Sequence, residues 1–163
     1  FDKAVIKLHG EFGYLSDYNA EVGLPPFERF YVGGDGLQNF SLDGREIIGL
    51  RGYPNLSIVP TDVQPAEAGA VYNKFTLELR YLVTENPNAQ IFGLTFLEGG
   101  NNYARFKNYE PFKLKRSAGF GLRIFMPMFG LLGVDFGYGF DGTPSNPFEP
   151  SGWNTHFIIG QQF

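Results

Sequence analysis

The sequence contains six segments, most of which alternate apolar and polar residues, and the connections between them alternate between long and short. Five segments place apolar residues at every second position, which is the period of a β-strand; a sixth, at 89–100, is mixed and is assigned as a strand from its neighbours. The six segments span residues 4–14, 71–83, 89–100, 116–126, 130–140 and 153–163. Counted back from the last segment, the connections are residues 141–152, 127–130, 100–115, 84–88 and 16–70, and so run long, short, long, short, long.

The two faces of these strands differ in their chemistry. In the segment 130–140, Leu132, Val134 and Phe136 point one way, whereas Asp135 and three glycines point the other way. The charged residues of the strands share the second face, and they are Lys7, Glu11, Lys74, Glu78, Arg80, Arg123 and Asp135. A soluble β-sandwich also alternates, but charges of this number suit a watery lumen better than a dry core.

The connection lengths favour a membrane barrel over a sandwich. Tight turns on one rim and long loops on the other are typical of outer-membrane barrels, whose strands need roughly 9 to 11 residues to cross. Six strands are fewer than the about eight of the smallest such barrels, and open sheet edges are not tolerated in lipid. We therefore predict an all-β fold of six antiparallel strands within a larger transmembrane β-barrel. The chain begins at Phe1, without an initiator methionine or a signal-peptide pattern, which agrees with a partial chain.

Composition narrows the function classes. The chain has 18 Phe, 9 Tyr and 22 Gly, which favours strands, and its net charge of -4 argues against a nucleic-acid binder. It has no cysteine, so disulfides, thiolate metal sites and cysteine nucleophiles are excluded. No stretch approaches the roughly 18 to 20 apolar residues of a membrane helix. Aromatic residues near strand ends are expected at the membrane interfaces, namely Tyr14, Tyr81, Tyr138, Trp153 and Phe163.

Several short motifs, in order, carry a family resemblance. They are "PPFERFYVGG" (25–34), "LRGY" (50–53), "TLELRY" (76–81), "FLEGG" (96–100) and the aromatic-ended "FIIGQQF" (157–163). This set resembles the Omp85 superfamily, in which an aromatic-rich segment precedes a "(V/L)RG(F/Y)" motif and a later strand carries "FxDxG". Glu98 stands where that family usually has aspartate. The resemblance implies that residues 1–163 are the C-terminal part of the barrel, about strands 11–16 of a 16-stranded barrel, and that 16–70 is a long external loop folded inward.

The resemblance also suggests a role for Arg51. Its rigid plane of five donors suits a bridge between Glu78 and Glu98, with Phe96 packed on the guanidinium face. Gly52, like Gly49, would let the backbone turn tightly beside the barrel wall. We expect a loop-anchoring motif of Leu50, Arg51, Gly52 and Tyr53, with lumen partners Glu78, Phe96, Glu98 and Gly100.

Within the superfamily the chain is most similar to outer-membrane protein assembly factors, which act without covalent chemistry. This similarity implies a bacterial outer-membrane location and, as partners, nascent β-barrel proteins, accessory lipoproteins of the assembly complex and outer-membrane lipids. Periplasmic POTRA repeats are expected upstream. The last strand would form one side of an opening seam, with Phe157, Gly160 and Phe163 at that gate. Gly160 would weaken and kink the strand, although a packing role is an equal alternative.

Other functions stay open. A polypeptide secretion transporter, of the two-partner or TamA-like type, shares these motifs, and some superfamily barrels follow a hydrolase domain that would lie upstream. A soluble sugar-binding sandwich is the remaining non-membrane alternative. The chain itself offers no catalytic pattern, cofactor motif or metal-ligand spacing, and His9 and His156 are interpreted as polar lumen residues.

Overall fold

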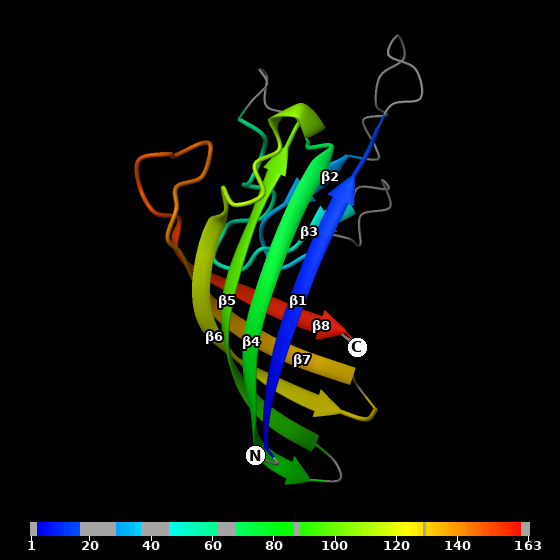
Figure 1. Ribbon diagram of the computed structural model, residues 1–163. Coiled ribbons are helices and arrows are strands. Elements are labelled where there is room, and N and C mark those ends of the chain that lie inside the picture. The colour runs from blue at the N-terminus through cyan, green and yellow to red at the C-terminus, as the bar shows by residue number, and fades with distance from the viewer. Residues whose placement is uncertain are drawn as a thin grey trace.

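Six long strands form one antiparallel sheet in the computed structural model, which describes residues 3–16, 29–36, 46–61, 68–86, 89–128 and 130–160. The strands follow the order β1-β4-β5-β6-β7-β8, so each long strand pairs with its successor among them (Figure 1). Their bounds are β1 Ala4–Tyr14, β4 Val71–Asn86, β5 Ala89–Tyr103, β6 Lys115–Met126, β7 Gly130–Gly139 and β8 Gly152–Gly160. The predicted all-β, antiparallel fold is confirmed, and the sheet is open, with β1 and β8 at its edges.

Two strands extend further than the pattern indicated. β4 continues to Asn86, which pairs with Ala89, so the short turn is shorter than the predicted 84–88. β5 continues to Tyr103, which pairs with Val71, so the next loop begins later than residue 100. The polar residues at the end of β5 do not alternate with apolar ones, so the sequence pattern did not predict that the strand continues. Their side chains instead bond the following loop.

The sheet has an inward face, which carries Glu78, Glu98 and Asp135, and an outward face of apolar side chains. These three acids are at most 6% exposed. Outward residues such as Leu77 (42% exposed) and Leu97 (55% exposed) are not covered by other described residues. A soluble sandwich buries its apolar face, so this inverted pattern is typical of a barrel wall. Among the described residues, no helix is long and apolar enough to cross a membrane.

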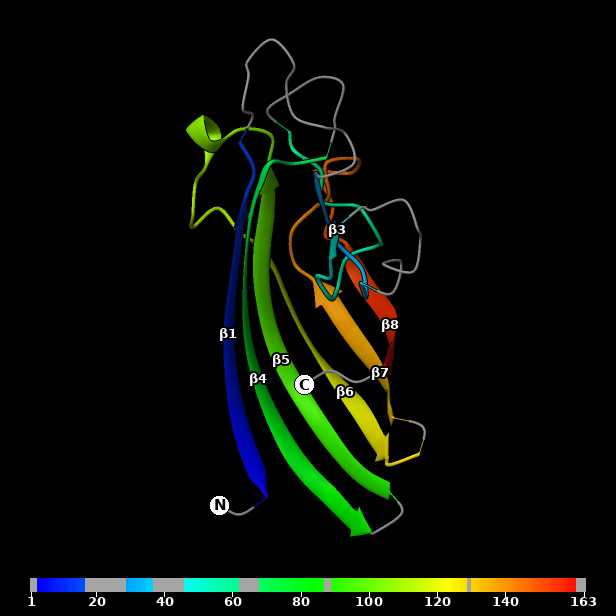
Figure 2. The same ribbon diagram turned by 90° about the vertical axis from the view of Figure 1, so that its right-hand side faces the viewer.

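The described parts of the connection between β1 and β4 lie against the inward face. Two short parallel strands, β2 (Phe30–Val32) and β3 (Glu46–Ile48), form a separate small sheet there (Figure 2). Single bridges join Val32 to Ile58 and Gly34 to Leu50. The segment has its own apolar core, formed by Phe30, Val32, Ile48, Leu50, Tyr53, Ile58 and, from β4, Tyr72. This core gives the long connection a defined shape beside the sheet.

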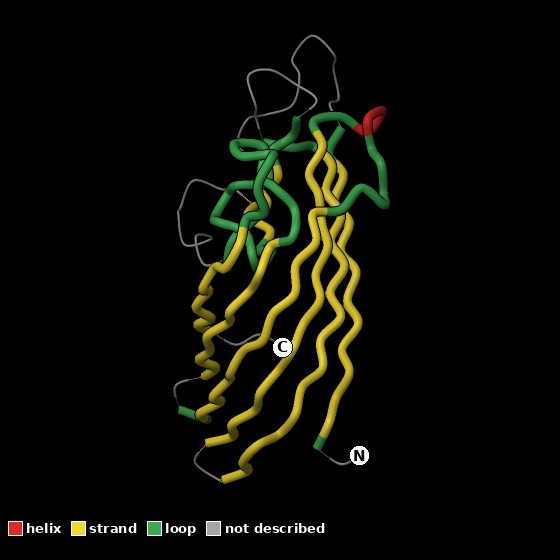
Figure 3. The backbone as a smooth tube through the Cα atoms, turned by 90° about the vertical axis from the view of Figure 1, so that its left-hand side faces the viewer, coloured by secondary structure: helices red, strands yellow, loops and turns green. Residues whose placement is uncertain are grey.

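The connection between β5 and β6, residues 104–114, lies on the other side of the sheet. It contains one 3-10 turn, η2 (Phe106–Asn108), which Figures 2 and 3 place across the sheet from β3. The long connections therefore gather at one rim, with short turns at the other. This arrangement positions a polar cluster on the inward face, under the segment that carries Arg51.

Candidate functional site

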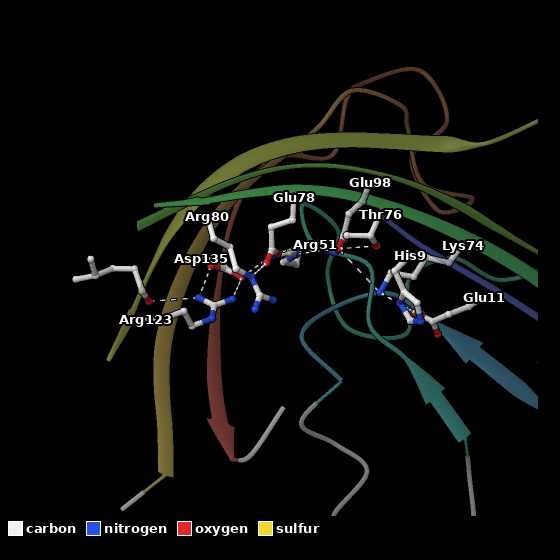
Figure 4. A network of polar contacts seen from close by, with 11 residues as sticks. His9, Glu11, Arg51, Lys74, Thr76, Glu78, Arg80, Glu98, Arg123 and Asp135 are labelled. Carbon is white, nitrogen blue, oxygen red and sulfur yellow. Dashed lines mark hydrogen bonds and ion pairs between the residues drawn. The ribbon is translucent and has the colours of Figure 1, made fainter. Parts of the chain in front are cut away.

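Arg51 is the centre of the polar cluster on the inward face (Figure 4). Its Nε and Nη2 donate to Oε1 of Glu98 at 2.9 and 2.6 Å. Its backbone N–H donates to Oε2 of the same carboxylate at 2.9 Å. Glu98 on β5 therefore holds both the side chain and the main chain of Arg51. This combination fixes the position of the loop as well as the direction of the guanidinium.

Three strands supply contacts to the same guanidinium. Nη2 also lies 3.0 Å from Glu78 Oε2 on β4, and Nη1 donates to Asp135 Oδ2 on β7 at 3.0 Å. The ring of Phe96 lies under the group, with Arg51 Cζ 3.7 Å from its centroid. Burial alone would lower the pKa of Arg51, but the nearby carboxylates, led by Glu98, raise it above its ordinary value. Arg51 therefore stays charged at neutral pH.

Other cations surround the three acids, so the charges alternate in sign. Arg123 on β6 binds Asp135 through two bonds of 2.6 Å, Arg80 pairs with Glu78, and Lys74 lies 4.0 Å from Glu98. Glu98 also accepts a 3.3 Å bond from the Thr76 hydroxyl. The acids thus keep other partners, but among the described residues only Arg51 contacts all three of them. A cavity of about 440 Å³, lined mainly by charged side chains, adjoins the cluster.

Gly52 brings the loop backbone into contact with the wall. Its φ of +87° lies in the left-handed region, and a side chain there would come within 2.8 Å of Ser117 Cβ. Its N–H donates to His156 Nε2 at 2.9 Å, and its carbonyl accepts from Asn154 Nδ2 at 3.0 Å. Both backbone polar groups of Gly52 are therefore bonded to side chains of β8. The loop motif holds the last described strand as well as the three strands that contact Arg51.

Glycines of β7 make this close approach possible. A Cβ added at Gly137 would lie 2.6 Å from the Gly52 nitrogen, and one at Gly139 would lie 2.4 Å from the Gly52 oxygen. Cβ atoms do not approach backbone atoms so closely. The glycine-rich inward face of β7 therefore forms a flat surface for the loop.

The two ends of the motif are buried. Leu50 and Tyr53 have no exposed surface, and both belong to the apolar core of the loop. The Tyr53 hydroxyl donates to the Arg116 carbonyl at 2.7 Å. Burial raises the pKa of Tyr53, so the phenol stays neutral. Gly100 lies next to Leu50, because a Cβ built on Gly100 would be 3.5 Å from a Leu50 methyl.

The structure brings together most of the residues singled out from the sequence. Arg51, Glu78, Phe96 and Glu98 form one cluster, whereas Gly100 neighbours Leu50. On β8, Phe157 faces outward and is 59% exposed. Gly160, the last residue of the strand, has a φ of +129°, with no atom of the described residues within 4 Å of an added Cβ. Phe163 lies outside the described residues.

Sequence reasoning missed four residues of the site. Asp135, Arg123, Asn154 and His156 were assigned to the inward face or left without a role, and none was linked to the loop motif. The available signal was Asp135, a single acid in a run of glycines on one face of β7. The partners on β8 gave no signal, because the loop that they bind is about a hundred residues away in the sequence.

Comparison with known proteins agrees with this geometry. The model of the Omp85 superfamily domain matches residues 1–163. The chain belongs to the Omp85 superfamily. It is 29% identical over 148 residues to the outer membrane protein assembly factor BamA of Nitratidesulfovibrio vulgaris, a match that covers 89% of this chain. The chain spans 17% of the length of that relative. The resemblance drawn from the motifs is thereby confirmed at the level of the family, and this Omp85 chain is assigned to the bacterial outer membrane.

Proposed function

We propose that this Omp85 chain is the C-terminal part of a 16-stranded barrel, about strands 11–16, that folds and inserts outer-membrane proteins as the core of a BAM-type complex. The similarity to a protein named as an outer membrane protein assembly factor supports this function. The observation that carries the proposal is that the loop motif is hydrogen-bonded to β8. Arg51 engages β4, β5 and β7, while the backbone N–H and carbonyl of Gly52 engage β8 through His156 and Asn154.

The proposed role of β8 follows from its place at the sheet edge. Within the described chain β8 pairs with β7 alone, so its other edge presents backbone N–H and C=O groups that an incoming strand can use. A strand that exchanges pairing partners at one edge must be held in place by contacts that do not involve that edge. The loop motif supplies this hold from inside, so β8 stays ordered while its outer edge is free for exchange.

The proposed seam ends at Gly160. The last pair of the β7–β8 ladder is Leu131 with Gly160, and the φ of Gly160 favours glycine over any residue with a Cβ. We assign Phe157, Gly160 and Phe163 to this gate, with Gly160 releasing the end of the strand from β7. The equal alternative of a packing glycine has no support among the described residues, where nothing contacts an added Cβ.

The segment 16–70 is proposed to fold into the lumen of the complete barrel. Its described parts lie against the inward face, and Leu50, Arg51, Gly52 and Tyr53 are its anchor. The proposed partners of the whole protein are nascent outer-membrane β-barrel proteins, BAM-type accessory lipoproteins and outer-membrane lipids. POTRA repeats are expected upstream of this part.

One observation favours a second function, polypeptide secretion. The charged cavity of about 440 Å³ lies beside the anchor and on the inward face, where a translocating chain would pass if the loop moved aside. Such a transporter, of the two-partner secretion or TamA-like type, would release its substrate across the membrane. It would not pass a folded barrel into the bilayer through the edge of β8.

Reconstitution of the full-length protein in lipid vesicles tests the proposal. A nascent barrel substrate is added, and its insertion is followed by its protection from protease. Arg51→Ala is expected to lower the insertion rate strongly, because it releases the loop from β4, β5 and β7. Arg116→Ala is the matched control, since Arg116 is 67% exposed at the same rim and pairs with Asp141. Equal rates for the two variants, or export of a soluble polypeptide in place of insertion, would contradict the assembly function.

A further inference from the structure

The connection between β5 and β6, residues 104–114, folds back over the outward face of the sheet. The ring of Tyr109 packs against Phe12, with centroids 5.5 Å apart, and that of Phe106 packs against Tyr14 at 5.0 Å. Phe12 and Tyr14 are outward residues of β1. They share this face with the exposed apolar side chains of the other strands, such as Leu77 and Leu97, which together are called the apolar band. Figures 2 and 3 show the segment across the sheet from β3. It therefore lies at the upper margin of the surface that faces lipid in a barrel.

Hydrogen bonds from outward side chains fix this segment. Asn73 Nδ2 donates to the Pro111 carbonyl at 2.8 Å, and Asn101 Nδ2 donates to the Lys113 carbonyl at 2.7 Å. The Tyr103 hydroxyl donates to the Glu110 carbonyl at 2.6 Å. These contacts explain Asn73, a polar exception on the apolar face of β4, because its side chain lies under the segment. The segment is thus a built part of the outward face.

The exposed side chains of the segment combine cations with aromatic rings. Arg105, Lys107 and Lys113 outnumber its one acid, Glu110, in a chain whose net charge is -4. Phe112 is 91% exposed. The loop 141–151 offers a contrast at the same rim, since it also exposes a phenylalanine but carries two acids and no lysine or arginine. Positive charge is therefore concentrated on the segment that overlies the apolar band.

Space for a headgroup exists beside these cations. A cavity of about 380 Å³ adjoins the segment, and its polar lining includes Thr61, Asn101, Lys107, Asn108, Glu110 and Lys113. The ammonium donors of Lys107 and Lys113 suit phosphate oxygens, whereas the single acid, Glu110, which lies 3.5 Å from Lys113 Nζ, favours a headgroup that also has hydroxyl donors.

We propose that segment 104–114 binds the phosphate-bearing headgroups of anionic lipids in the leaflet at the rim of the long loops. Lys107 and Lys113 contact the phosphates, and Phe112 enters the boundary between headgroups and acyl chains. The charge of the segment is complementary to such a lipid surface, and the segment continues the apolar band that contacts acyl chains. The proposal requires the outward face to lie in the membrane and does not depend on assembly activity.

Hydrogen exchange of the full-length protein in nanodiscs tests this proposal. Discs of phosphatidylcholine alone are compared with discs that also contain phosphatidylglycerol, and with phosphatidylcholine discs in buffer with inorganic phosphate. Phosphatidylglycerol is expected to slow amide exchange in 104–114 and to leave 141–151 unchanged. Equal exchange in both lipids, equal slowing in both loops, or slowing by free phosphate alone would overturn the proposal.

Exposed positions allow clean variants. Lys107→Gln and Lys113→Gln are each expected to weaken the preference for phosphatidylglycerol, measured with spin-labelled lipids, by up to about fivefold. Lys7→Gln removes the same charge from the inward cavity and should leave the preference unchanged. Phe112→Ser should reduce protection of 104–114, whereas Phe148→Ser, at a residue of similar exposure in the acidic loop, should not. A wild-type protein without any preference for the anionic lipid refutes the proposal regardless of how the variants fold.

Discussion

Replacing Arg51 by alanine tests the loop anchor most severely, and its cost follows from the contacts that remain. Asp135 keeps its two bonds to Arg123, and Glu78 keeps Arg80. Glu98 loses its two bonds from the guanidinium; among the described residues it keeps the backbone N–H of residue 51, the Thr76 hydroxyl and Lys74 at 4.0 Å, although its side chain is 2% exposed. The loss is therefore centred on Glu98.

Removing one partner of a buried ion pair typically costs about 3 to 5 kcal/mol. The lower value corresponds to an increase of roughly 100-fold or more in the open population of the loop. Proteolysis reports that population when opening and closing are fast relative to cleavage. We therefore expect cleavage within residues 46–61 of the folded full-length barrel to accelerate by about two orders of magnitude in Arg51→Ala. The cleavage rate of Arg51→Lys should lie between those of the wild type and Arg51→Ala, because lysine keeps the positive charge but cannot reproduce the paired bonds to Glu98.

A double-mutant cycle separates the pair from a general loss of packing. Glu98→Gln in the Arg51→Ala background removes the unpaired buried charge, so the double variant should open less than the sum of the single effects predicts. Cleavage of Arg51→Ala at the wild-type rate, or strict additivity of the two substitutions, would show that the Arg51–Glu98 pair does not anchor the loop.

Three further predictions concern the surroundings of the anchor. Gly137→Ala should displace the loop and speed its proteolysis, because the new methyl would meet loop backbone at 2.6 Å, whereas Gly93→Ala has open space and should behave as wild type. His156→Leu leaves a buried loop N–H without its acceptor, so hydrogen exchange at that amide should rise by about tenfold or more, and His156→Gln should restore much of the protection. Burial would raise the pKa of Asp141, but hydrogen bonds from Arg116 lower it below its ordinary value; exchange of loop 141–151 should therefore stay constant above about pH 4 and increase only below it, as Asp141 is protonated. An increase that begins near neutral pH would contradict that assignment.

The strands were predictable because their chemistry is local. A period of two, glycine opposite bulky residues and alternating connection lengths specify which face of β7 or β8 points inward without knowledge of the partners. The start of β5 at Ala89 agrees with the prediction, but its C-terminal end was not predictable, because Asn101 and Tyr103 bond a loop that the sequence does not place.

The residues of the site that belong to recognisable sequence motifs were predictable, and the other residues of the site were not. Glu78, Phe96 and Glu98 follow from motifs on neighbouring strands, so their approach to Arg51 could be inferred. The bonds from Gly52 to His156 and Asn154 depend on how deeply the loop enters and on the register between β7 and β8. The depth of the loop is set by the packing of its backbone on glycines of β7. The sequence shows these glycines but not which segment packs on them.

Site-specific photo-crosslinking during assembly tests directly whether substrates pair at the edge of β8. A photoreactive residue is placed at Phe157, on the outward face of the edge strand β8, in the full-length protein, and a nascent barrel substrate is supplied. Leu97, on β5 inside the sheet, is the matched control, since both side chains face outward with similar exposure of 59% and 55%. We expect cross-links to the substrate from position 157 and none from position 97. Equal cross-linking from both positions, or none from position 157 while the substrate inserts, would contradict assembly at the edge of β8.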